Sequence, residues 1–85
     1  MSLQSGLINA VIIDDIPEAI SVLTADLNTY CKNIEVIGSA NGVVSGAKII
    51  KELKPDLVFL DIQMPDGTGF DLLEILRETN LKLIF

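Results

Sequence analysis

The sequence predicts an α/β protein built on a doubly wound parallel sheet, and three observations carry that prediction. Short apolar runs alternate with segments of helical periodicity, in the order strand, helix, strand, helix, strand, helix, strand. The run at 57–60 is apolar without alternation, which indicates a strand buried on both faces, as in a parallel sheet. The connections are short, so right-handed crossovers are expected to place helices on both faces of the sheet.

The first strand is expected at residues 7–13, which are rich in β-branched side chains. The helix that follows carries three start signals: Asp15 can cap it, Pro17 lies in its first turn, and Glu18 stands at the capping-box position. Its expected inner face recurs at three- and four-residue spacing and consists of Ile20, Leu23, Leu27 and Tyr30.

The second strand is expected at 34–38, before Asn41 and Gly42 break the chain. The second helix is expected at 43–54, where Pro55 stops it. Its expected inward residues are Val44, Ala47, Ile50 and Leu53.

The third strand is expected at 56–61 and the third helix at 70–77. Asp66 is a candidate cap for that helix. Its expected inner face consists of Phe70, Leu73 and Leu76. A fourth strand is expected at 81–85.

Composition limits what this chain can be. Its 85 residues, 49% of them hydrophobic, allow one small domain, expected at 6–85 with a flexible tail or cloning remnant at 1–5. A net charge of −6 argues against direct binding of nucleic acid by this segment. Cys31 is a single cysteine, which excludes an internal disulfide and fits a reducing compartment, so we expect a cytoplasmic protein. No secretory signal or transmembrane stretch is visible, and no membrane partner is expected.

Acidic residues follow two of the predicted strands where each strand ends. Asp14 and Asp15 close the first strand, and Asp61 closes the third. Strands of a parallel sheet end at one edge, so the strand order 2-1-3-4 would bring the three carboxylates into one crevice. Three close anions repel one another, and a divalent cation relieves that cost. Magnesium prefers oxygen ligands, so we expect these three acids and the backbone carbonyl of Gln63 to bind Mg²⁺.

A carboxylate beside a bound metal suits phosphoryl transfer. An ionised aspartate needs no general base, because its reference pKa is ~3.9. The metal would neutralise charge on the incoming phosphoryl group, which makes Asp61 the candidate phosphoacceptor. Each acid taken alone also has a simpler interpretation: Asp15 as a helix cap, Asp14 as a solvated acid, and Asp61 as an ordinary loop residue.

Three stretches resemble the receiver domain of two-component response regulators: VIIDD at 11–15, KPDLVFLDIQMP at 54–65 and GFDLL at 69–73. The resemblance extends over residues 9–85. It implies a flavodoxin-like fold in which Asp61 accepts a phosphoryl group from a sensor histidine kinase, with Asp14, Asp15 and the Gln63 carbonyl around Mg²⁺. It further implies a phosphorelay signalling module that is not an enzyme and that regulates an output domain for transcription outside this segment.

Within that family, residues 34–38 and 57–65 are most similar to receivers that precede LytTR-type DNA-binding domains. A complete receiver also has a fifth strand ending in Lys, a Ser or Thr ending the fourth strand, and two further helices. This chain has no counterpart of these parts, so slow phosphorylation and no transmission by the usual switch are expected. The fourth strand would form an open edge, and self-association through that edge or through the exposed sheet face is expected.

Three other functions compete with this interpretation. A phosphatase with a nucleophilic Asp often needs a second acid two residues later, where Gln63 cannot transfer a proton. A flavin-binding protein needs a phosphate-binding loop after its first strand, where residues 14–17 would repel phosphate. A non-phosphorylated interaction fragment stays open as an alternative.

Overall fold

The computed structural model describes residues 7–61, 63–76 and 82–84. Its elements are, in chain order, β1 (Ile8–Ile13), α1 (Pro17–Tyr30), β2 (Ile34–Ala40), α2 (Val43–Leu53), β3 (Leu57–Leu60), β4 (Gln63–Met64), β5 (Gly67–Thr68), α3 (Gly69–Ile75) and β6 (Lys82–Ile84). The predicted tail at 1–5, the predicted helix end at residue 77, and the outer residues of the predicted fourth strand lie outside the described residues.

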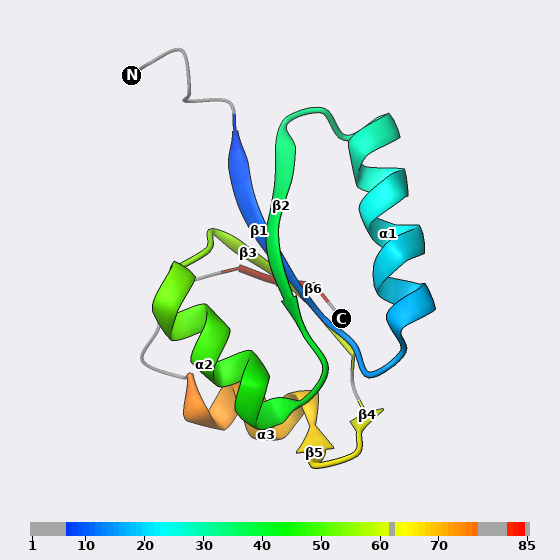
Figure 1. The fold of residues 1–85 in the computed structure, drawn as a ribbon. Helices are drawn as coiled ribbons and strands as arrows, with labels where there is room; N and C mark the ends of the chain where they lie inside the picture. The colour runs from blue at the N-terminus through cyan, green and yellow to red at the C-terminus, as the bar shows by residue number, and fades with distance from the viewer. Residues whose placement is uncertain (1–6, 62, 77–81, 85) are drawn as a thin grey trace.

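Four parallel strands form the main sheet in the order β2-β1-β3-β6. This confirms the predicted α/β class and the predicted strand order 2-1-3-4, with β6 as the fourth strand. Figure 1 shows α1 on one side of the sheet and α2 with α3 on the other, the arrangement of a doubly wound fold. β6 is an edge strand of the described sheet, and self-association through it stays a prediction.

The larger core lies between the sheet and the helices α2 and α3. Because strand side chains alternate between faces, every second residue of β1 and β3 points to this side. Its buried members are Val11, Ile13, Val43, Ala47, Ile50, Val58, Leu60, Met64, Leu72 and Leu76. Burial of this set supplies the main hydrophobic contribution to folding.

The opposite face of the sheet packs against α1, where Leu27 is buried. Tyr30, which the sequence predicts to face inward, is 80% exposed at the end of the helix. The predicted cap is also wrong: the N-cap residue is Ile16, and no side chain caps the helix. Pro17 does start α1, as predicted, because its fixed φ suits the first helical position.

The inner face of α2 is rotated from the predicted one. Val43, Ala47 and Ile50 are buried, whereas Val44 is 71% exposed and Leu53 is 41% exposed. The reason is Gly46, which is also buried: a Cβ there would lie 2.8 Å from Ile13 Cδ1. The missing side chain lets α2 approach the sheet closely along this line, which a count of large apolar residues does not detect.

The buried face of α3 also differs from the predicted one. Leu72 and Leu76 are buried, Leu73 is half-buried, and Phe70 is 62% exposed. Thr68 is the N-cap, because its hydroxyl accepts a hydrogen bond from Asp71 N (3.2 Å) while the Asp71 carboxylate accepts from Thr68 N (2.9 Å). This capping box replaces Asp66, which was expected to cap α3 and instead caps α2.

Two features were not predicted from the sequence. β2 extends to Ala40, because β1 offers pairing partners as far as Ile13. A small antiparallel hairpin, β4–β5, fills the loop after β3, where Gly67 adopts φ +151°. No helix in the described part of the chain is long and apolar enough to cross a membrane.

Candidate functional site

The candidate site lies where β1 and β3 end side by side. Ile13 pairs with Leu60 at the last rung of the two strands, so the residues that follow leave the sheet at one edge. One carboxylate oxygen from each of Asp14, Asp15 and Asp61 lies within 4.8 Å of the others. The structure therefore brings together the three acids that the sequence singled out.

The backbone of the two strand-end acids is fixed by the sheet. Asp61 N donates to Ile13 O at 2.9 Å, and Asp14 N donates to Ala40 O at 3.0 Å. The Asp14 carboxylate also accepts a hydrogen bond from Ile16 N at 3.0 Å, which orients its side chain. A cluster held by three adjacent strands needs little rearrangement to bind an ion.

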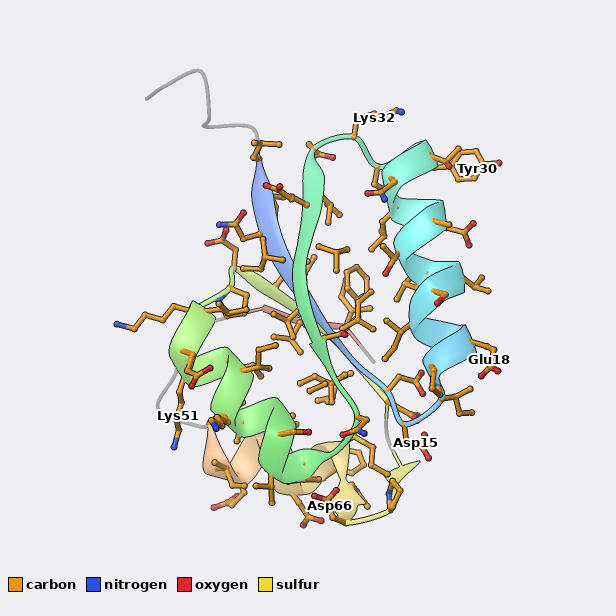
Figure 2. The ribbon with its side chains drawn as sticks, viewed as in Figure 1. Asp15, Glu18, Tyr30, Lys32, Lys51 and Asp66 are labelled. Atoms are coloured by element: carbon orange, nitrogen blue, oxygen red, sulfur yellow. The ribbon has the colours of Figure 1, made fainter. Side chains whose placement is uncertain are left out.

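The simpler interpretation of Asp15 as a helix cap is wrong, because α1 has no side-chain cap. Figure 2 shows Asp15 at the turn between β1 and α1, at the end of the molecule that also carries Asp66. Asp14 and Asp61 are half-buried.

The donor set fits a hard divalent cation. Three carboxylates supply oxygen ligands and enough negative charge to compensate a +2 ion, and partial exposure leaves room for the waters that Mg²⁺ retains. Gln63, the fourth predicted contributor, begins β4 two residues after Asp61. Its backbone is therefore close to the cluster along the chain, and its role as a ligand stays a prediction.

A hollow of about 340 Å³ adjoins the acids on the α1 side of the sheet. Its lining combines the two strand-end carboxylates with apolar side chains of the sheet and α1: Ile12, Ile13, Asp14, Leu23, Phe59, Leu60, Asp61 and Ile84. The carboxylate of Asp61 thus borders open space from which a small anionic group can approach.

Asp66 makes a contact with α2 that the sequence did not predict. Its carboxylate accepts hydrogen bonds from Val43 N at 2.8 Å and from Val44 N at 3.2 Å, the first two amides of α2. These bonds, the one from Val43 first, hold the pKa of Asp66 below its ordinary value. No local sequence pattern could reveal the pair, because 23 residues separate Asp66 from Val43.

The depressed pKa gives Asp66 a defined pH signature. A carboxyl group whose pKa is lower in the folded than in the unfolded chain stabilises the fold above its unfolded pKa, and the effect is lost as pH falls through the folded pKa. The melting temperature of the wild type should exceed that of Asp66→Ala by a constant margin at neutral pH. The margin should shrink once pH drops below 3.8, the ordinary value of the group. A margin that grows with acidification would contradict this assignment.

The chain belongs to the family of response regulator receiver domains, whose model matches residues 10–85. The fold described above is thus that of a receiver domain, a module of two-component signalling. The family membership confirms the resemblance seen in the sequence.

Relatives and solved structures agree with this assignment. The chain is similar to an uncharacterized response regulatory protein of Vibrio vulnificus, 50% identical over 78 residues that cover 92% of this chain and 32% of that protein. It is similar to the transcriptional regulatory protein BtsR of Escherichia coli, 36% identical over 70 residues that cover 82% of this chain and 29% of that protein. The MaeR response regulator bound to beryllium trifluoride superposes with a TM-score of 0.83 at 26% identity, covering 92% of this chain and 65% of that one.

The chain spans about a third of the length of the Vibrio response regulatory proteins that it matches. The similarity thus concerns one module of longer proteins.

Proposed function

We propose that this chain is the phosphoacceptor module of a two-component phosphorelay, and that Asp61 takes a phosphoryl group from a sensor histidine kinase with Mg²⁺ bound beside it. The observation that carries the proposal is the convergence of three carboxylates from the ends of β1 and β3 within 4.8 Å. Family membership supports it, since two-component signalling is what receiver domains serve.

In the proposed reaction, a carboxylate oxygen of Asp61 attacks the phosphorus atom of a phosphohistidine. The new oxygen–phosphorus bond forms as the phosphorus–nitrogen bond breaks, and the departing nitrogen keeps the electron pair and takes up a proton. Asp14, Asp15 and Asp61, with the Gln63 carbonyl, would hold the cation. When bound, Mg²⁺ would offset negative charge on the transferring group. The sheet holds the Asp61 backbone in place through the bond to Ile13 O.

Magnesium binding tests the site before any phosphate is added. The wild-type chain should bind Mg²⁺ saturably, and Asp14→Asn should weaken binding by about 10-fold or more, because one of three charged ligands becomes neutral. Isothermal titration calorimetry measures this directly. Asp26→Asn, a change on α1 outside the cluster, is the matched control and should bind as the wild type does.

Equal Mg²⁺ affinity of the wild type and Asp14→Asn would exclude the cluster as the metal site. Binding by neither protein would favour the non-phosphorylated interaction fragment.

We further propose that the phosphorylated module regulates transcription through an output domain elsewhere in the protein. The support is the similarity to BtsR, whose name describes a transcriptional regulatory protein, and the greater length of the relatives. The acidic charge of this segment, −6, fits a regulatory module that leaves DNA contact to another part.

A further inference from the structure

The hairpin that follows β3 is connected to α2 by one side chain. Gln63 pairs with Thr68 and Met64 with Gly67, so Pro65 and Asp66 form the two-residue turn of the hairpin. Asp66 thus lies in the same hairpin as Gln63, the residue whose carbonyl is the proposed fourth ligand of the cation. Figure 2 shows Asp66 at the lower end of the molecule, beside the start of α2.

The start of α2 depends on Asp66 for its hydrogen bonds. The N-cap residue, Gly42, has no side chain that could satisfy the first amides of the helix. Both oxygens of Asp66 do so instead, one at Val43 N (2.8 Å) and one at Val44 N (3.2 Å). A negative charge at a helix N-terminus is also favoured by the helix dipole.

There is no room for a further side chain at Gly42 or Gly67, beside the contact between Asp66 and α2. A Cβ on Gly42 would lie 2.8 Å from the nearer Asp66 oxygen, and a Cβ on Gly67 would lie 3.0 Å from a Val43 methyl group. Met64, in the first strand of the hairpin, is buried in the same core as Val43. Hairpin and helix are therefore joined by two hydrogen bonds, and Met64 and Val43 belong to the same buried core.

We propose that Asp66 is a positioning residue for the cation site. By binding the first amides of α2, it fixes the hairpin that begins at Gln63, and so holds the Gln63 carbonyl where the cation needs it. The inference rests on the proposed function, because it concerns the affinity of the same site. Asp66 itself contacts α2 and not the cation.

The first test compares Mg²⁺ titrations of the full chain and its variants. Asp66→Ala is expected to bind Mg²⁺ about 10-fold more weakly, the usual effect of losing a residue that orients a ligand. Asp56→Ala is the matched control: its carboxylate also accepts a backbone hydrogen bond, from Asn9 N at 3.0 Å, but at the opposite ends of β1 and β3. It should lower stability and leave Mg²⁺ affinity unchanged.

Asp66→Asn separates positioning from charge. The amide keeps an oxygen that can accept from Val43 N, but its NH2 group cannot accept from Val44 N, so its Mg²⁺ affinity should lie between those of the wild type and Asp66→Ala. If Asp66→Asn binds Mg²⁺ no better than Asp66→Ala, the bond from Val43 N does not hold the site, and the positioning role is overturned.

Gly42→Ala tests the same contact from the helix side. Gly42 has extended backbone angles (φ −166°, ψ 179°), so Ala meets no backbone strain and acts through the collision with Asp66. In the wild-type background it should weaken Mg²⁺ binding and lower the melting temperature. In the Asp66→Ala background it should leave the Mg²⁺ affinity unchanged, because the colliding carboxylate is gone.

The experiments distinguish a failure of the positioning role from a failure of the proposed function. Normal Mg²⁺ affinity in a less stable Asp66→Ala would overturn the positioning role and leave the proposed function intact. Additive effects of Gly42→Ala and Asp66→Ala would show that the two residues do not act through one contact, which also overturns it. Failure of the wild type to bind Mg²⁺ would overturn both proposals.

Discussion

Asp61→Asn is expected to abolish phosphorylation of this chain. The amide is nearly isosteric with the carboxylate but is a poor nucleophile, and it cannot form an acyl phosphate. Incubation with a phosphorylated histidine kinase domain, or with a small phosphoryl donor and Mg²⁺, should label the wild type and not the variant. The change in intact mass reports the label without relying on its stability in gels.

The loss should not come from misfolding. Asp61 is half-buried and its backbone bond to Ile13 O does not depend on the side chain, so Asn fits the same place. Removing one of three clustered negative charges also relieves repulsion, and the melting temperature without metal should stay equal or rise. The control is Asp71→Asn, an exposed acid in the capping box of α3, which should be labelled as the wild type is. Equal labelling of wild type and Asp61→Asn would refute the assignment of the phosphoacceptor.

The parallel strands and the acids at their ends could be predicted because both depend on patterns that are local in the sequence, whereas the strand order 2-1-3-4 was taken from the resemblance to receiver domains. Uniform apolar runs such as 57–60 reveal buried parallel strands, and an acid after such a run has to lie at the carboxyl edge of the sheet. The position of Asp61 next to Asp14 follows from these two facts and the strand order, without any knowledge of side-chain contacts.

The inner faces of the helices were harder to predict. On α2 the buried face follows Gly46, which adds no hydrophobicity to a periodic pattern but allows close packing against Ile13. On α3 the helix begins at Gly69, and its register is set by the Thr68 capping box. On α2 tertiary packing therefore decided which apolar residues became exposed, and on α3 a local capping contact fixed where the helix starts.

The role of Asp66 could not be predicted from the sequence, for a different reason. A side chain that caps a helix 23 residues away has no signature in either segment, because a glycine N-cap and an acidic turn are each common. The contact depends on the sheet, which places the ends of the parallel strands β2 and β3 at the same edge.

Leu72→Ala is expected to destabilise the fold by about 3 kcal/mol, within the range for truncating a buried leucine. Leu72 is fully buried on α3 and faces the glycine of α2: a Cβ on Gly46 would lie 3.4 Å from a Leu72 methyl group. The side chain therefore fills the space that the missing Gly46 side chain leaves. Because Gly46 has no atoms that could move into the cavity, the site should relax poorly after truncation.

Ile75→Ala on the same helix is the control for the predicted orientation of α3. Ile75 is 48% exposed, and Ala is the better helix former, so the change should alter the free energy of unfolding by less than about 1 kcal/mol. Urea denaturation of both variants, followed by circular dichroism, measures the difference. A loss at Ile75 as large as that at Leu72 would mean that α3 presents a different face to the core, and that Leu72 does not fill the gap beside Gly46.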